Sequence, residues 1–401
     1  MSSFTQAGKT YTAVAGNRAT SNVGSSAAIR DVQKAMITYQ PYQTPLLTRL
    51  MSEKTGRRPT GNYKFEYSYS TLIPRTATVT LVGGAANEDN ITVSSADLFQ
   101  VGTMFVVDTT GEVLVVDSIA SSQVDVTKVG AGNITAGSSV TVRFIAPSFE
   151  EGSVSAQAIS VNKNFEYNYT QEVKKSVQAT GRQTAMVEYG EEDWMRNKRD
   201  RMAEWKIDIE ASLLFGRTYL MSTGISGTYQ QTFTGGLFYG SGNNAYINGV
   251  DTTALGSIDE TYFFGTMAKN IFAKGSSTKR LYCGSAIKNK ISSFSRANLL
   301  TKVGDKEYGV DIRKVETDFG MLEVAWHPML EGSKYSAWGV VLDLDGDYLK
   351  YRFLNGNGVN RDFKFVDYPQ FDENELKKGE WKADIGWQIE GDENHYLIEA
   401  A

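Results

Sequence analysis

The chain has few of the residue types from which catalytic and metal sites are usually built. Its 401 residues include one cysteine, Cys283, and two histidines, His327 and His395. A lone cysteine excludes an internal disulfide and a cysteine-based zinc site. Metal and nucleophilic sites usually recruit several such residues, so both histidines are expected to be structural. We therefore expect no enzyme and no cofactor.

Charge and hydropathy argue against two further classes of protein. The net charge of −5 and pI of about 5.4 predict no bulk attraction to nucleic acid, although a protein that merely encloses DNA remains allowed. No run of 18 apolar residues occurs, so we expect no membrane partner. The opening residues lack the basic and apolar regions of a secretory signal, so none is expected.

Two near-copies of one pentapeptide lie a hundred residues apart, at 65–69 and 165–169. Their rings alternate with polar side chains, which predicts strands with one apolar and one wet face. The rings are Phe65, Tyr67 and Tyr69 in the first copy and Phe165, Tyr167 and Tyr169 in the second. Aromatic residues at matching positions make good cross-strand partners. We predict that the copies pair as antiparallel legs of one β-arm, a device for assembly rather than catalysis.

The segment between the two copies has its own composition, rich in Val, Thr, Ser and Gly. Short alternating runs separated by turns occur at 77–82, 103–108, 112–118, 123–129 and 139–145. Five short strands at roughly ten-residue spacing predict a small β-barrel or sandwich inserted into the arm.

The strongest helical pattern covers residues 191–215. Its acidic first turn suits the positive end of the helix dipole, and Gly216 is a plausible C-cap. The apolar stripe consists of Trp194, Met202, Trp205, Ile209 and Leu213. The opposite face carries a basic run with Arg196, Arg199 and Arg201. Because acidic residues lie among them, we expect a solvated face or intersubunit ion pairs rather than nucleic-acid binding.

The remainder predicts an α+β body. Short helices are expected at 46–51, 257–274 (capped by Ser257) and 285–298. Strands are expected at 279–283, 310–317, 320–327, 338–342, 348–354, 381–390 and 395–399. The acidic run 343–347 does not match the ligand spacing of a calcium loop, and a tight turn between its flanking strands explains it.

Residues 1–28 are rich in Ser, Thr, Ala and Gly, with few large apolar groups. By itself such a segment favours a floppy tail. The alternative is an arm that becomes ordered only against a neighbouring subunit.

The order of these parts resembles a known family. Thr170 and Gln171 in the second leg, then Gly190, precede a helix that ends in the pattern E-x-x-L-L-x-G, from Glu210 to Gly216. This order resembles the major capsid proteins of tailed bacteriophages, which have the HK-ninety-seven-type fold. The resemblance covers about residues 30 to 400, and its strength lies in the order of the parts.

The resemblance implies a division of the chain. Residues 1–59 would be the N-terminal arm, 60–74 and 152–180 the legs of the E-loop, and 75–151 an inserted β-barrel-like domain. Residues 181–256 would form the spine helix and peripheral domain, 257–345 the axial domain, and 346–401 a return to the peripheral domain. The arm aromatics and the three arginines would be assembly contacts.

The implied function is structural. Many copies would self-assemble, as pentamers and hexamers, into an icosahedral shell around double-stranded DNA packaged non-specifically. Scaffolding, portal and decoration proteins would be further partners, the shell would be assembled in the host bacterial cytoplasm, and the protein would reside in the virion. The alternative is a phage or bacterial surface protein whose inserted domain binds carbohydrate.

Overall fold

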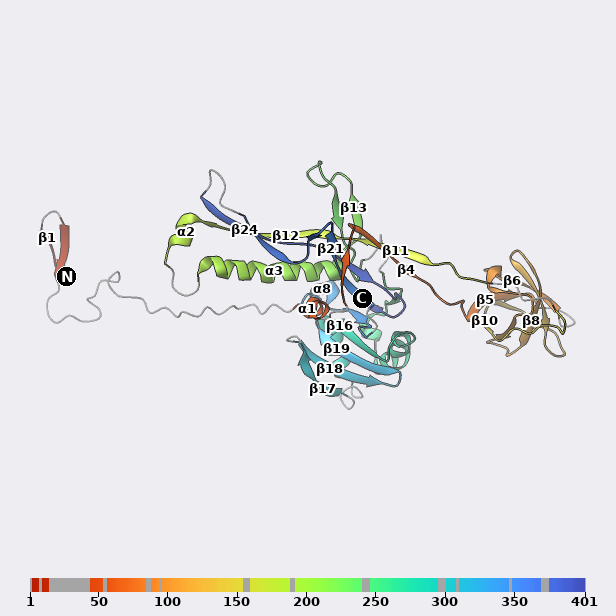
Figure 1. The fold of residues 1–401 in the computed structure, drawn as a ribbon. Coiled ribbons are helices and arrows are strands. Elements are labelled where there is room, and N and C mark those ends of the chain that lie inside the picture. The colour runs from red at the N-terminus through yellow and green to blue at the C-terminus, as the bar shows by residue number, and fades with distance from the viewer. Residues whose placement is uncertain are drawn as a thin grey trace. The chain divides into compact units, whose positions relative to one another are not determined.

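The computed structural model describes residues 2–6, 9–13, 44–52, 56–83, 88–93, 95–153, 159–187, 192–239, 246–294, 301–307, 310–345, 348–368 and 375–400. The chain divides into two compact units (Figure 1). We call Met1–Phe65 with Asn168–Ala401 the body, and Glu66–Tyr167 the insert. Near the N-terminus, β1 (Ser2–Gln6) and β2 (Lys9–Ala13) pair as an antiparallel hairpin. The rest of the expected 1–28 arm lies outside the described residues.

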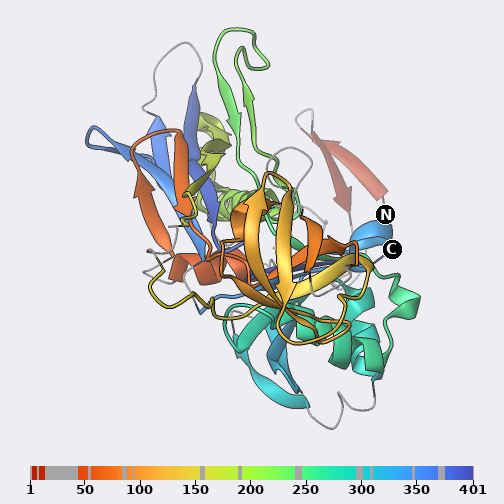
Figure 2. The ribbon, with the colours of Figure 1, turned by 90° about the vertical axis from the view of Figure 1, so that its right-hand side faces the viewer.

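The insert contains a closed barrel, drawn in orange to yellow in Figure 2. Its six strands follow the order β10-β5-β6-β9-β8-β7. The strands are β5 (Thr76–Leu81), β6 (Glu88–Val93), β7 (Met104–Val107), β8 (Val113–Ala120), β9 (Gln123–Lys128) and β10 (Gly137–Phe144). A 3₁₀ turn, η2 (Ala96–Leu98), precedes β7. Five of the six were predicted, and β6 was missed. Closure depends on β6, because it joins β5 to β9.

Alternation along the barrel strands fills the interior of the insert. Inward residues such as Val79, Ile91 and Leu114 are buried, while their neighbours are more exposed. Phe99 and Phe105 meet edge to face, with ring centroids 5.8 Å apart. Period-two patterning therefore places one apolar row per strand in a common core.

One sheet of the body has six strands. Its path is β12 (Gln171–Thr180), β24 (Leu376–Ile389), β21 (Leu349–Gly356) and β22 (Val359–Asn360), with β23 (Lys364–Tyr368) on β24 and β3 (Arg57–Thr60) parallel to β21. β12 and β24 pair over ten residues, from Gln171↔Ile385 to Thr180↔Leu376. This long antiparallel pair is the platform for the main helix.

The main helix, α3 (Asp193–Phe215), packs on β12 and β24. The predicted stripe is buried at Trp194, Trp205, Ile209 and Leu213, but Met202 is only half-buried. Trp205 stacks on Trp381 at 5.9 Å between centroids. Gly216 caps the helix for a steric reason, since a Cβ there would lie 2.4 Å from the carbonyl oxygens of Ser212 and Thr234.

The other sheet of the body has seven strands, in the order β15-β25-β20-β16-β19-β18-β17. They are β15 (Gly249–Asp251), β25 (Tyr396–Glu399), β20 (Trp338–Leu342), β16 (Thr278–Cys283), β19 (Gly320–Trp326), β18 (Val310–Thr317) and β17 (Thr301–Glu307). One face joins the core around α3, and the other packs on short helices.

Two predictions about these helices need correction. The helix expected at 257–274 is shorter and irregular: after η3 (Leu255–Ser257), it runs without a gap through α4 (Glu260–Tyr262), a π-helical turn (Phe263–Met267) and α5 (Ala268–Ile271). Its N-cap is Asp259, whose side chain accepts from the Tyr262 N–H at 2.7 Å, and not Ser257. The next helix, α6, covers Ser285–Ser293, and residues 295–298 of the predicted range lie outside the described residues.

One prediction about a connection was also wrong. The strands flanking 343–347 do not form a hairpin, because β20 and β21 belong to different sheets. The Asp343 carboxylate is buried and accepts hydrogen bonds from the Ser276 N–H (2.7 Å) and hydroxyl (2.9 Å). Residues 346–401, expected as one return segment, contribute strands to both sheets of the body: β24 joins the six-stranded sheet, and β25 pairs with β20 and β15.

Four short elements complete the body. They are α1 (Pro45–Ser52), which was predicted, α2 (Gly181–Ala185), α8 (Gly332–Tyr335), and a hairpin of β13 (Tyr219–Met221) and β14 (Gln231–Phe233). None of the helices that the structure describes is long and apolar enough to cross a membrane.

Candidate assembly surfaces

The two pentapeptide copies form adjacent strands, as predicted. β4 (Lys64–Tyr69) pairs with β11 (Asn164–Tyr169) in a two-stranded sheet, which we call the arm. At its base the Thr170 N–H donates to the Tyr63 carbonyl at 2.8 Å. The rings of Tyr63 and Tyr169 stack there, 6.2 Å between centroids. The insert, Glu66–Tyr167, is thus connected to the body through the two paired strands β4 and β11.

The two aromatic rows do not share a buried face, contrary to the expectation of matched cross-strand rings. In β4 the buried residues are Phe65 and Tyr67. In β11 the buried residue is Asn168, whereas Phe165 is 67% exposed. Tyr69 and Tyr167 are also exposed, and Tyr169 is half-buried. The alternating pattern that the two pentapeptides share predicts the spacing of the rings along each strand. It does not predict which side of the two-stranded sheet is buried.

The basic run on α3 is held by local ion pairs. Arg196 pairs with Asp193, and Arg201 lies 2.6 Å from Glu204, each three residues away. Arg199 and Arg201 are exposed, while Arg196 is half-buried. Lys198, in the same run, lies over the Phe365 ring at 3.7 Å from its centroid. The run is therefore balanced by neighbouring acids, and a nucleic-acid role gains no support from it.

The β13–β14 hairpin is a candidate surface that the sequence analysis missed. It projects from the body in both views, drawn in green (Figures 1 and 2). Its connecting loop exposes Ile225 (85%) and Tyr229 (78%), and Tyr219 at its base is also exposed. The sequence pattern that could have predicted this hairpin is a Gly-rich turn, Gly224 to Gly227, flanked by aromatic residues. Large apolar side chains exposed together on one hairpin indicate an interaction surface.

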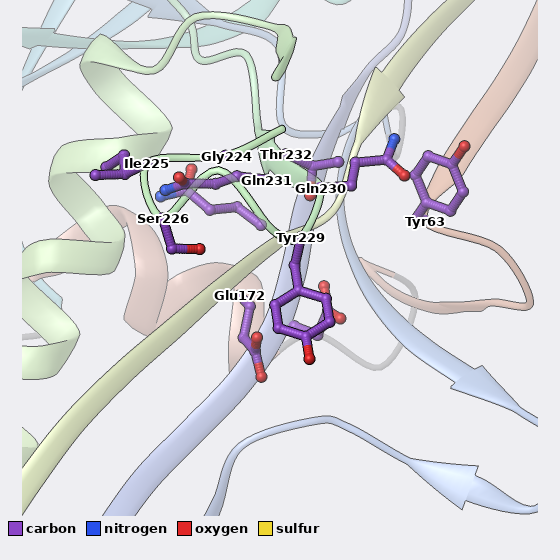
Figure 3. Close-up of a pocket in the computed structure, with 11 residues that line it drawn as sticks. Tyr63, Glu172, Gly224, Ile225, Ser226, Tyr229, Gln230, Gln231 and Thr232 are labelled. Atoms are coloured by element: carbon purple, nitrogen blue, oxygen red, sulfur yellow. The ribbon is translucent and has the colours of Figure 1, made fainter. Parts of the chain in front are cut away.

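A groove of about 600 Å³ separates this hairpin from the six-stranded sheet (Figure 3). The sheet side contributes Tyr63, Gln171, Glu172 and Asp384, and the hairpin contributes residues from Gly224 to Thr232. Glu172 lies 3.0 Å from the Lys174 ammonium, and Asp384 lies 3.3 Å from Arg361 Nε. Burial raises the pKa of Asp384. The groove therefore offers aromatic rings, amides and paired carboxylates, groups that can bind a polypeptide segment.

Of the groups singled out for possible chemistry, His327 is hydrogen-bonded to other residues of the body, and His395 and Cys283 are buried. The His327 ring accepts the Met329 N–H at Nδ1 (3.2 Å) and lies 2.7 Å from Glu210 Oε1 through Nε2. Burial lowers the pKa of His395 to about 4 and raises that of Cys283 to about 12. Within the described residues, no three His, Cys, Asp or Glu side chains gather closely enough to hold a metal ion.

Two of the comparisons with known proteins found matches. A family model described as the SU10 major capsid protein matches residues 5–401. The fold is similar to the capsid of a native GTA particle, at 10% identity over 96% of this chain and 99% of that one, with a TM-score of 0.51. Weaker similarities include the cyanophage A-1(L) capsid (10% identity, 95% and 99% covered, TM-score 0.49) and the capsid of Myoviridae phage XM1 (9%, 97% and 100%, 0.47). No curated protein matches the chain significantly.

Fold and surfaces together define a capsid-type structural protein, with a mixed α+β body of the HK-ninety-seven type. The chain belongs to the SU10 major capsid protein family. Its role is structural, as the subunit of a capsid shell.

Proposed function

We propose that many copies of this chain assemble, through the arm and the N-terminal segment, into an icosahedral shell that encloses double-stranded DNA. The family match over residues 5–401 is the observation that carries the proposal. In this assignment the arm is the E-loop, α3 is the spine helix, the six-stranded sheet is the peripheral domain and the seven-stranded sheet is the axial domain. Many modest contacts, each weak alone, sum to a stable shell through multivalency.

The charge distribution supports an outward position for the insert. Its residues, Glu66–Tyr167, include eleven Asp and Glu but only four Lys and Arg, a formal net charge of −7. The whole chain carries −5, so the remaining residues carry +2. Packaged DNA repels an acidic module, whereas a near-neutral body can border it. We therefore propose that the insert faces away from the DNA, where decoration proteins would also bind.

The exposed side of the arm is proposed as the main contact with a neighbouring copy. Phe165 and Tyr167 present rings to solvent on a strand whose other face is less exposed. Burying such rings against another subunit yields roughly 1.5–3 kcal/mol each. The hairpin tip, with Ile225 and Tyr229, is proposed as a second contact for the same reason.

Negative-stain microscopy of the purified protein tests assembly directly. Wild-type protein is expected to form shells, tubes or capsomers. Phe165→Ser is expected to reduce them while leaving the melting temperature of the free subunit unchanged, because the ring is already exposed there. Val129→Ser, which removes an exposed apolar side chain from the barrel surface, is the control and is expected to assemble normally. A permanently monomeric protein with affinity for glycans would overturn the proposal.

A further inference from the structure

Asn168 is a polar residue that is completely buried in the body. Its amide nitrogen donates to the carbonyl oxygens of Gly235 (3.0 Å) and Trp387 (2.7 Å). Its amide oxygen accepts from the N–H groups of Gly235 (2.8 Å) and Tyr169 (2.8 Å), and from the Thr218 hydroxyl (3.2 Å). Both donors and the acceptor of the side chain are therefore in use.

Gly235 forms two of these hydrogen bonds through its backbone, at a position where a side chain would not fit. It offers both its N–H and its C=O to the same amide, a cyclic pair that only an amide side chain can complete. A Cβ at this position would lie 2.2 Å from the Thr218 hydroxyl oxygen and 2.7 Å from the Tyr246 ring. Glycine is required here because backbone and side chain approach so closely.

The other strand of the arm, β4, packs against β24 next to Trp387. Phe65 is buried, and a Cβ at Gly386 would lie 2.7 Å from its ring and 2.8 Å from the Tyr169 carbonyl oxygen. The Arg352 guanidinium lies 5.7 Å from the centroid of the Phe65 ring. Gly386 and Trp387 are consecutive residues of β24, so neighbouring residues of this strand contact Phe65 of β4 and Asn168 of β11. We call Phe65, Asn168, Gly235, Gly386 and Trp387 the arm root.

The arm root coincides with the boundary between the two compact units. That boundary falls after Phe65 and before Asn168, so these two root residues are the last body residue before the insert and the first after it. A loosened root would leave the rest of the body folded but would release the body end of the arm.

We propose that Asn168 is a positioning residue for assembly: its saturated amide holds the body end of β11 against β24, and the arm needs this fixed end to bind a neighbouring copy. The inference rests on the proposed function of the arm as an intersubunit contact. A carboxylate cannot replace the amide, because it would place an oxygen against the carbonyl oxygens of Gly235 and Trp387.

Asn168→Asp and Asn164→Asp are matched variants for the test. They make the same substitution on the same strand, but the Asn164 side chain is exposed. In free subunits, hydrogen exchange is expected to accelerate at residues 168–171 and 233–236 in Asn168→Asp only. The concentration needed for shell formation is expected to rise by at least about tenfold in that variant, since two buried acceptors lose their donors. Asn164→Asp is expected to match the wild type in both measurements.

Thr218→Ala keeps the test decisive if Asn168→Asp does not fold. It removes the longest of the five hydrogen bonds to Asn168, together with the contact of the Thr218 hydroxyl with the Tyr246 hydroxyl (2.5 Å), so a smaller loss of assembly in the same direction is expected. Unchanged exchange at the root in both variants would overturn the inference, as would normal shells from subunits whose root exchanges faster. Wild-type protein that forms no shells would instead overturn the proposed function, and this inference with it.

Discussion

The Glu210 carboxylate lies wholly inside the body, where it joins three distant parts of the chain. It accepts hydrogen bonds from the N–H groups of Leu46 (3.2 Å) and Leu47 (3.3 Å) at the start of α1, and from Nε2 of His327 (2.7 Å) after β19. Because Met329 donates its N–H to Nδ1 of His327, Nε2 carries the proton. The helix end pattern containing Glu210 thus has a physical role: its acid caps another helix.

Glu210→Gln is expected to reduce the free energy of unfolding by about 1–3 kcal/mol, because the new amide group would face the Leu47 N–H and leave it unsatisfied. Urea denaturation of the free subunit measures this change. Glu204→Gln is the matched control, since its carboxylate lies on the same helix, is 38% exposed and forms ion pairs with Arg201 and Lys175. Equal losses in the two variants would contradict a special role for the buried acid.

His395 makes stability depend on pH. Burial lowers its pKa from 6.5 to about 4, and its Nδ1 accepts the Asp343 N–H at 3.2 Å. The unfolded chain therefore binds a proton at higher pH than the folded chain does. Stability is full above about pH 6.5 and falls as the pH drops towards 4, by about 3 kcal/mol in total.

The His395 prediction can be checked by comparing wild type with His395→Gln by urea denaturation between pH 7 and pH 4.5. The variant should lose less stability over this range, because it lacks the histidine that becomes protonated on unfolding. Some loss remains in both proteins, because their other acidic groups titrate over the same range. An NMR titration of the wild type is simple to assign, since the chain has only two histidines. A His395 pKa near 6.5 would refute the argument.

At the scale of elements, the helix α3 and the barrel are the two parts that local patterns specify best. The helix buries its stripe on the long β12–β24 pair, where Trp205 contacts the rings of Trp381 and Phe363. The barrel closes on itself through strands that all lie between Thr76 and Phe144. Each element can therefore be altered without redesigning the other.

Trp205→Ala is expected to cost roughly 3–5 kcal/mol of unfolding free energy, because the missing ring leaves a cavity between helix and sheet. Thermal and urea denaturation of the free subunit measure it. Met195→Ala on the same helix removes a side chain that is already exposed and should change little. A Trp205 variant with unchanged melting would mean that the helix does not depend on this contact.

Replacing residues 76–147 by a short Gly-Ser linker is expected to leave a soluble, folded body. Thr76 pairs with Arg143 across β5 and β10, and Pro147 follows Arg143 by four residues, so a short linker can span the gap left by the excised segment. Circular dichroism and the melting temperature of the body measure the outcome. A shortened protein that fails to fold would show that the barrel is not separable.

At the scale of the whole molecule, three charge blocks follow one another along the chain. Residues 1–65 carry nine Lys and Arg but two Asp and Glu, the insert carries a net −7, and the rest is mildly acidic. Because one subunit carries both a basic segment and an acidic insert, the basic segment of one copy attracts the insert of another. Two inserts, which have the same sign of charge, repel each other.

Deleting residues 1–25 is expected to leave the melting temperature of the subunit unchanged but to impair shell formation or shell stability. Taken alone the segment suits a tail, but an arm that orders on a neighbour would pay its ordering entropy only on assembly. Hydrogen exchange should show these amides unprotected in free subunits and protected in shells. Normal shells from the truncated protein would leave the segment as a tail.

Local periodicity in the sequence was sufficient to predict the paired legs of the arm, five of six barrel strands and the helix at 193–215, because alternation and helical stripes are properties of neighbouring residues. Tertiary structure alone decided that β20 and β21 separate, that β25 joins the seven-stranded sheet, and that Asn168 rather than Phe165 faces inward. These outcomes depend on hydrogen bonds between residues far apart in the chain, such as Asn168 with Trp387 and Glu210 with Leu46, and no local pattern encodes such partners.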